Sequence, residues 1–83
     1  MILLPTQSRM ARAALGWGVR ELAAAAKVSI DTVARFERGD ELKERTIEAL
    51  RRTLEAAGVK FIDENGGGAG VRLRKPTKEK SRK

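Results

Sequence analysis

The side chains best suited to chemistry lie between positions 29 and 38. Ser29, Asp31, Arg35 and Arg38 fall within about three helical turns of one another. A serine at the start of a helix accepts hydrogen bonds from the free N–H groups of the first turn. Arginine can donate two hydrogen bonds to guanine O6 and N7, and aspartate can accept one from cytosine N4. The segment therefore combines a helix cap with side chains that can hydrogen-bond an outside partner, although Asp31 has a simpler role available in stabilising the positive end of the helix dipole.

The composition offers little to an enzyme. The chain of 83 residues contains no cysteine and no histidine, which removes thiolate chemistry, disulfides, the commonest general base and the commonest metal ligand. The glycine-rich stretch 66–70 lacks the Gly-Lys-Ser/Thr ending of a phosphate-binding loop and is interpreted as a flexible hairpin turn. We therefore expect no enzymatic activity, no cofactor and no bound metal.

The positive charge of the chain is concentrated at its C-terminal end. The formal net charge is +7, and residues 72–83 carry seven Lys or Arg against one Glu. The rest of the chain carries 11 basic and 10 acidic side chains and is almost neutral. A cationic tail attracts polyanions such as nucleic acids, so this one could add an affinity for DNA that ignores sequence and falls steeply with salt. The alternative is that the tail only keeps the chain in solution.

Apolar spacing and end signals predict four helices. They cover residues 6–15, 19–26, 30–38 and 44–57, with apolar side chains three or four positions apart along each. Ser29 is the expected N-cap of the third helix. The glycines expected to end three of the helices are Gly16, Gly39 and Gly58. The buried stripe of the first helix is expected to consist of Met10, Ala11, Ala14 and Leu15.

The pattern changes after residue 58. Residues 59–62 and 71–74 have the composition of two short strands, with residues 63–70 as their connection. An isolated hairpin is marginal in water, so we expect Phe61 and Leu73 to pack on the helices, or the hairpin to pair with another subunit. The chain is therefore divided into a helical domain (1–58), a hairpin extension (59–75) and a basic tail (76–83) that is expected to be disordered.

The sequence carries no sign of export or of a membrane anchor. Residues 1–4 are apolar, but the stretch is too short for a secretion signal and lacks its positive flank. No apolar run approaches the roughly 20 residues needed to cross a bilayer. We expect a cytoplasmic protein that has no membrane partner.

Several short motifs resemble one family of DNA-binding proteins. The segments are RAALGW at 12–17, ELA at 21–23, VS at 28–29 and VARFERG at 33–39. With the apolar helix that follows, they resemble the Cro-repressor-like (XRE) helix-turn-helix transcriptional regulators over about residues 4–59. The stretch FIDENGGG at 61–68 resembles the ending of many short stand-alone members. The resemblance implies a lambda-repressor-like fold, with an all-α core of four to five helices and a short C-terminal β-hairpin.

The resemblance also implies roles for individual residues. Arg12 and Glu37 correspond to a partly buried ion pair that joins the first helix to the third. The third helix would enter the DNA major groove, and Arg35 is the strongest candidate for reading a base. Core positions are implied for Leu15, Leu22, Val28, Val33, Phe36 and Leu50, and Trp17 is interpreted as core packing rather than as a base-stacking platform. The full set of expected DNA contacts is Arg20, Lys27, Ser29, Ile30, Asp31, Thr32, Ala34, Arg35, Arg38 and Lys43.

Four residues depart from the pattern of the family. Gly18 and Val19 stand where the second helix usually begins with Ser or Thr followed by Gln, and Val19 cannot make the hydrogen bonds of Gln. Lys27 stands where the turn usually has Gly, in a conformation that is harder for Lys, although its charge could contact a phosphate. Asp31 repels phosphate at the front of the third helix. These departures affect base reading rather than the fold.

The function that combines these observations is regulation of transcription. We expect sequence-specific binding to double-stranded DNA, as a homodimer on an inverted repeat. The preferred dimer surfaces are the hairpin and the apolar N-terminus, Ile2–Leu4. The alternative is a module with the same fold that binds a protein partner, such as an antitoxin or an anti-regulator, and the almost neutral body, Val19 and Asp31 favour it.

Overall fold

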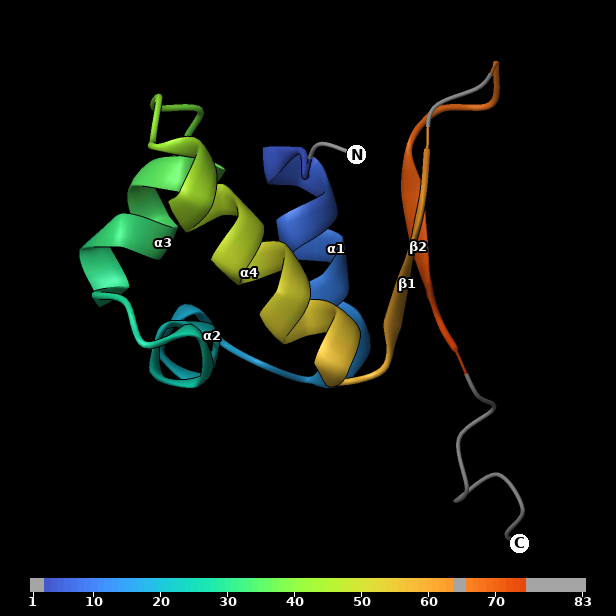
Figure 1. The fold of residues 1–83 in the computed structure, drawn as a ribbon. Helices are drawn as coiled ribbons and strands as arrows, with labels where there is room; N and C mark the ends of the chain where they lie inside the picture. Colours follow the sequence, from blue (N-terminus) through green and yellow to red (C-terminus); the bar gives the residue numbers. More distant parts are fainter. Residues whose placement is uncertain (1–2, 64–65, 75–83) are drawn as a thin grey trace, which may run out of the picture.

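Four helices and a C-terminal hairpin make up the part of the chain that the computed structural model describes, residues 3–63 and 66–74 (Figure 1). In chain order they are α1 (Pro5–Leu15), α2 (Val19–Ala26), α3 (Ile30–Glu37), α4 (Glu44–Ala56), β1 (Val59–Ile62) and β2 (Gly70–Leu73). The two strands are antiparallel. The expected all-α core with a short hairpin is therefore confirmed. The expected disordered tail at 76–83, and Ile2 of the N-terminal segment, lie outside the described residues.

The helix boundaries follow from local signals in the sequence. Gly16 ends α1 in the left-handed conformation, with φ of 72°, which suits glycine because it has no Cβ. Ser29 caps α3, where its Oγ accepts from the backbone N–H of Thr32 at 3.0 Å. The Leu4 N–H donates to Gln7 Oε1 at 3.0 Å where α1 begins. The predicted bounds of α2 are confirmed, and each of the other helices differs from its prediction by one residue at one end.

The core lies where the helices and the hairpin meet. The buried apolar side chains among the described residues are Leu3, Ala11, Leu22, Ala23, Val33, Phe36, Leu50, Leu54, Val59 and Phe61. Partly buried side chains that pack against them include Leu15, Trp17 and Val28. The predicted stripe of α1 is wrong at Ala14, which is exposed, whereas Gln7 and Ser8 are buried. The buried side of α1 is thus centred on residues 7, 8 and 11, because polar side chains occupy part of it.

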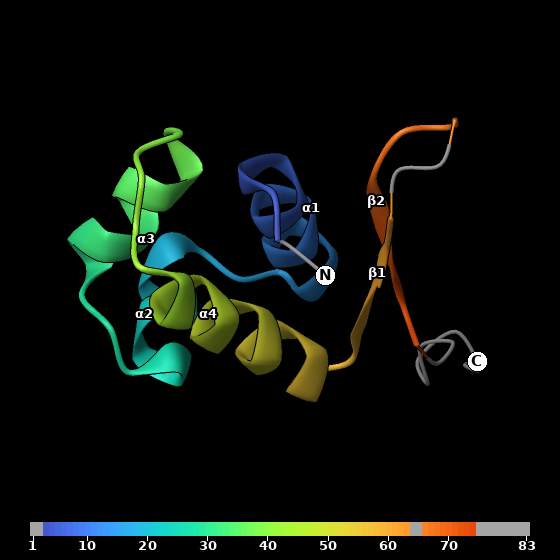
Figure 2. The ribbon, with the colours of Figure 1, turned by 45° about the horizontal axis from the view of Figure 1, so that its top comes forward.

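The hairpin packs against α1 and α4 (Figure 2). Phe61 is buried and Leu73 is partly buried against the core, as expected, while the alternate residues Lys60 and Arg72 are exposed. Strand β2 was expected at 71–74 but begins and ends one residue earlier, because the ladder that pairs Lys60 with Arg72 extends to Gly70 opposite Ile62. Helices and hairpin therefore share one core.

A buried amide ties the loop end of the hairpin to α1. The Nε2 of Gln7 donates to the carbonyl oxygens of Ile62 and Gly70, both at 3.2 Å. These two residues face each other across the ladder. A buried polar group left without partners costs roughly 1–3 kcal/mol, so the geometry of the hairpin and that of α1 depend on each other.

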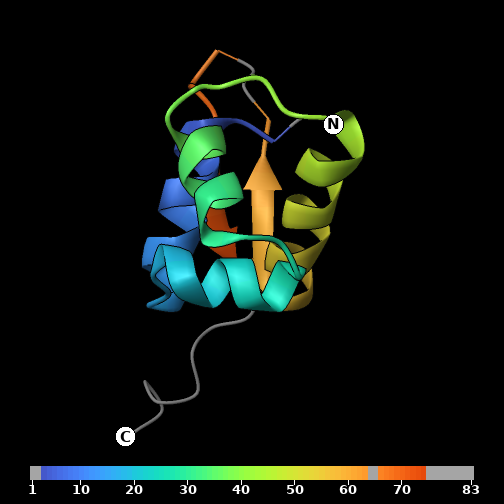
Figure 3. The same cartoon turned by 90° about the vertical axis from the view of Figure 1, so that its left-hand side faces the viewer.

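The two ends of the molecule are formed by α3 and by the hairpin. Seen from the α3 side, α1 and α4 flank the view and the hairpin lies behind them (Figure 3), and in Figure 1 α3 and the hairpin stand at opposite sides of the helices. None of the described helices is long and apolar enough to cross a membrane.

Candidate nucleic-acid interface

The leading turn of α3 lies at the surface, and a three-residue turn joins it to α2. The two helices pack against each other. The Oγ of Ser29 lies 2.8 Å from Thr32 Oγ1, so the two hydroxyl groups are held together at the helix N-terminus. Ile30 is 46 % exposed, and Asp31 is exposed. The turn therefore presents hydroxyl, apolar and carboxylate groups beside the positive end of the helix dipole.

The rest of α3 is divided into a buried and an exposed side. Val33 and Phe36 are in the core, and their spacing of three residues places them on the same side of the helix. Ala34 is partly buried. The side chains of Arg35 and Arg38 are 43 % and 62 % exposed. The helix thus offers two guanidinium groups to a partner while its apolar side is occupied.

Asp40, in the connection to α4, contacts both of these arginines. Its Oδ2 lies 2.9 Å from Arg38 Nη2 and 3.6 Å from Arg35 Nε, and its N–H donates to the Arg35 carbonyl at 3.0 Å. Within residues 3–63 and 66–74, no hydrogen bond involves the terminal nitrogens of Arg35, so an edge that can bind guanine O6 and N7 is open. Exposed ion pairs contribute little to stability, so the main effect of Asp40 is on where the arginines lie.

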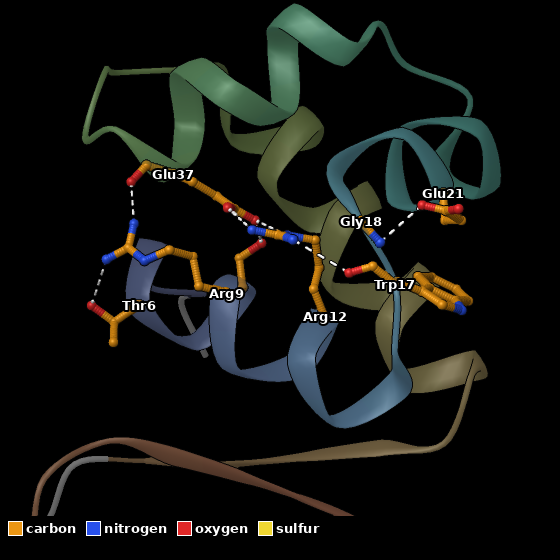
Figure 4. A network of polar contacts seen from close by, with 8 residues as sticks. Thr6, Arg9, Arg12, Trp17, Gly18, Glu21 and Glu37 are labelled. Atoms are coloured by element: carbon orange, nitrogen blue, oxygen red, sulfur yellow. Dashed lines mark hydrogen bonds and ion pairs between the residues drawn. The ribbon is translucent and has the colours of Figure 1, made fainter.

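A cluster of polar contacts fixes the last residue of α3 to α1 (Figure 4). Arg12 donates to Glu37 Oε1 through Nη2 at 2.7 Å and to Oε2 through Nε at 2.9 Å. Ser8 Oγ donates to Oε2 at 2.6 Å, and Arg9 Nη1 donates to the backbone oxygen of Glu37. The Arg12 and Glu37 side chains are only 19 % and 7 % exposed. This partly buried ion pair sets the orientation of α3 from its C-terminal end.

Both members of the ion pair are charged at neutral pH. Burial raises the pKa of Glu37, but the hydrogen bonds from Arg12 and Ser8, together with the charges of Arg12 and Arg9, outweigh burial and hold this pKa below its usual value. The pKa of Arg12 is raised, chiefly by its hydrogen bond to Glu37. Only acid can therefore break the pair by protonation.

The turn between α2 and α3 depends on a lysine in the left-handed conformation. Lys27 has φ of 61° and ψ of 43°, and among the described residues it is the one non-glycine residue with positive φ. This conformation costs roughly 1–2 kcal/mol for a residue with a Cβ. The Lys27 side chain is exposed, which leaves its ammonium group accessible to a phosphate. Val19, by contrast, packs against the core and offers no polar group.

The remaining predicted contacts lie on other elements. Arg20, in the first turn of α2, and Lys43, directly before α4, are both exposed. Neither forms an ion pair with any residue that the structure describes. Sequence reasoning missed Ser8, Arg9 and Asp40. Arg9 lies one helical turn from Arg12, a spacing that could have indicated it. Ser8 is recognisable only once α1 meets α3, and the contacts of Asp40 depend on the path of the chain after α3.

No protein-family model matches the chain, and no curated protein matches it. Among the residues that the structure describes, no group of three or more Asp, Glu, His or Cys side chains could hold a metal ion. The surface that remains to be explained is the exposed side of α3 with its neighbouring cations.

Proposed function

We propose that this chain binds double-stranded DNA as a Cro-repressor-like regulator of transcription, with α2 and α3 acting as a helix-turn-helix and α3 entering the major groove. The observation that carries the proposal is the exposure of the leading turn of α3, opening at Ser29, on a helix whose other side is buried. In helix-turn-helix proteins the N-terminal residues of the second helix contact base edges. An α-helix also matches the width of the major groove.

The proposed contacts divide into those that position and those that specify. Ser29, Lys27 and Lys43 offer hydroxyl or ammonium groups to phosphates, and such contacts fix the register of a protein on the duplex without reading sequence. Arg35 reads guanine through its open terminal nitrogens. Arg38 is the more exposed of the two α3 arginines and binds a phosphate beside the groove.

The acidic residue at the front of α3 contributes to selectivity. Asp31 is exposed and repels phosphate, so it lowers affinity for DNA in general. It can accept a hydrogen bond from cytosine N4, which recovers the loss only where a cytosine stands at the right position. A carboxylate on a reading helix therefore widens the difference between a matching and a non-matching site.

A homodimer on an inverted repeat is part of the proposal, and we propose that its contact includes the exposed apolar side chains Leu4 and Ile62. Leu3 is buried in the core, so within Ile2–Leu4 only Leu4 is an exposed apolar residue among those described. Ile62 on the hairpin is exposed as well. Gln7 bonds the backbone of both, which places the two previously separate candidate surfaces next to each other. Leu4→Glu should therefore reduce the mass measured by light scattering.

Selection from a random duplex pool at physiological salt tests the proposed function. The expected result is recovery of an inverted repeat. Fluorescence anisotropy on the recovered duplex and on a scrambled one then compares Arg35→Ala with Arg52→Ala, which removes an exposed arginine from α4. Arg35→Ala should lose about 1–3 kcal/mol on the recovered duplex and relax one base position. Arg52→Ala should leave the preference between the two duplexes unchanged.

The proposal fails if the pool yields no motif, or if Arg35→Ala and Arg52→Ala behave alike. The second candidate function, a module that binds a protein partner, is supported by the exposed Ile30 beside Asp31 on α3. Because antitoxins often bind DNA as well, the observation that distinguishes this function is a partner that copurifies in fixed stoichiometry and is released by Ile30→Ser.

A further inference from the structure

The hairpin carries a second cationic surface, which we call the outer hairpin face and define as Lys60, Arg72 and Arg74. Side chains alternate across a strand, and Val59, Phe61 and Leu73 pack against the helices, so the three cations lie on the opposite, exposed side. The exposed Ile62 lies on the same side, at the loop end of β1. The Arg74 N–H donates to the Gly58 carbonyl at 2.7 Å, which continues the ladder past Leu73 and keeps Arg74 on the side of Arg72.

The charges of the outer hairpin face are unbalanced. Lys60 stands directly opposite Arg72 in the ladder, and like charges in that position destabilise a sheet. None of the three cations forms an ion pair with any residue in the described ranges 3–63 and 66–74. The arginines of α4 differ in this respect, because Arg51 and Arg52 both pair with Glu48. No carboxylate among residues 3–63 and 66–74 relieves this repulsion, which favours an anionic partner at the hairpin.

The chain beyond the outer hairpin face has the same sign. Residues 75–83 contain five Lys or Arg and one Glu. A second copy of the chain is a poor occupant of the three cations, because a two-fold contact centred on them places the same patch on itself and would oppose cations to cations. The proposed dimer contact at Leu4 and Ile62 lies beyond them, at the loop end of the hairpin. The one exposed apolar side chain on this side of the described hairpin, Ile62, lies at its loop end, so the attraction of the three cations is for an extended array of negative charge rather than for one shaped ligand.

The outer hairpin face points away from α3. The hairpin and α3 lie at opposite sides of the helices in Figure 1, and seen from the α3 side the hairpin is behind α1 and α4 (Figure 3). A straight duplex seated on α3 therefore runs along the far side of the molecule from Lys60 and Arg72.

We propose that the outer hairpin face binds the phosphate backbone of a second DNA duplex, so that the protein links two DNA segments. This inference rests on the proposed function of α3, which holds the first duplex. Cations two residues apart along a strand are about 6.6–6.8 Å apart and give a row that can follow a line of phosphates. Binding at this face reads no bases and weakens as salt rises.

A bridging assay with the full-length chain tests the inference. One duplex that carries the selected site is fixed to beads, and a labelled duplex of unrelated sequence is captured from solution. The test variant is Arg72→Glu, which places a carboxylate opposite Lys60 and so removes the like-charge repulsion. The control is Arg52→Glu, the same charge change on an exposed arginine of α4. Melting temperatures establish that both variants fold.

The expected result is that Arg72→Glu lowers capture of the second duplex by about tenfold or more, because two units of charge change at a phosphate-binding surface. Its affinity for the selected duplex alone should stay within about twofold of the unsubstituted chain. Arg52→Glu should leave both measurements unchanged. Capture should also disappear at high salt before binding to the selected duplex does.

Four outcomes would overturn the inference while leaving the role of α3 intact. The unsubstituted chain could bind the selected duplex without capturing a second one. Capture could survive Arg72→Glu, which would assign the link to a dimer that presents two α3 helices. Arg72→Glu could weaken single-duplex binding as much as capture, which would place both surfaces on one duplex. Polyglutamate could compete off the second duplex more effectively than unlabelled DNA at the same concentration of negative charges, which would indicate an acidic protein partner. Failure of α3 itself is read separately, from the absence of a selected motif.

Discussion

Replacing Glu37 by glutamine should strongly destabilise the protein, although the shape of the side chain is kept. The carboxylate accepts from Arg12 through both oxygens and from Ser8 through one. An amide has only one oxygen, and its NH₂ group is a donor. Glu37→Gln therefore sets donor against donor at one of these contacts and leaves the positive charge of Arg12 uncompensated.

The burial of the pair sets the size of the effect. Removing one partner of a buried ion pair costs about 3–5 kcal/mol. The Arg12 side chain is 19 % exposed and can be partly hydrated, so the expected loss is near the lower end, about 3 kcal/mol. One kcal/mol shifts the Tm of a domain of this length by about 4–8 °C. The Tm should therefore fall by about 12–24 °C.

Thermal and urea unfolding followed by circular dichroism measure this loss at neutral pH. Glu55→Gln is the matched control, because the Arg51–Glu55 contact has the same 2.7 Å distance as the closest contact between Arg12 and Glu37, but the Glu55 side chain is 37 % exposed. Arg51 also contacts Glu48 and so keeps a carboxylate partner in this control, and an i,i+4 pair within one helix is worth about 0.3–0.5 kcal/mol. The control should therefore change Tm by only a few degrees.

The pH dependence of stability provides a second test of the role of Glu37. The pKa of Glu37 is lower in the folded chain than in the unfolded one, so its contribution is present above the pKa of an unfolded glutamate, about 4.3, and is lost as pH falls through the folded value. The Tm difference between the unsubstituted chain and Glu37→Gln should thus close in acid. A difference that does not change with pH, or a neutral-pH loss under about 1 kcal/mol, would refute the assigned role of the pair.

Three further substitutions have expected outcomes. Lys27→Gly should raise the free energy of unfolding by about 0.5 kcal/mol, because relief of the left-handed strain exceeds the entropy cost of glycine. The control Ala24→Gly, within α2, should instead lower it by about 1 kcal/mol in the same unfolding assay. Gln7→Glu should lower the free energy of unfolding by about 1–3 kcal/mol at neutral pH, because it places a carboxylate against two carbonyl oxygens. Amide hydrogen exchange in the hairpin should become faster, and an unchanged rate would contradict the role of Gln7 in holding the hairpin on α1. Asp40→Asn should raise the affinity for both the selected and the scrambled duplex and reduce the ratio of the two affinities, as measured by anisotropy. A larger ratio would contradict the role of Asp40 in positioning the two arginines.

The ends of the helices are predictable from sequence because each is determined within one turn. Ser29 supplies its own hydroxyl to the first turn of α3, and Gly16 adopts a conformation that other residues resist. The exposed side of α3 is predictable for the same reason, since the apolar spacing of Val33 and Phe36 fixes which side is buried. The sequence therefore predicts where along the chain the candidate site lies.

The buried polar contacts are not predictable in the same way. The apolar stripe of α1 was expected to include Ala14, but Gln7 and Ser8 are buried instead. Their partners come from other elements, as Ser8 bonds Glu37, 29 residues away. Polar residues are ordinarily exposed, so only the meeting of distant segments shows which ones are buried. Asp40 was missed because its contacts depend on the path of the chain after α3.

The burial pattern of α3 also makes this small chain a candidate scaffold for new sequence preferences. Val33 and Glu37 hold the helix in place, whereas Ile30, Asp31 and Arg35 face outward. A library that varies only these three outward positions would sample many reading surfaces on one unchanged body. With no cysteine in the chain, every member could be screened under oxidising or reducing conditions alike.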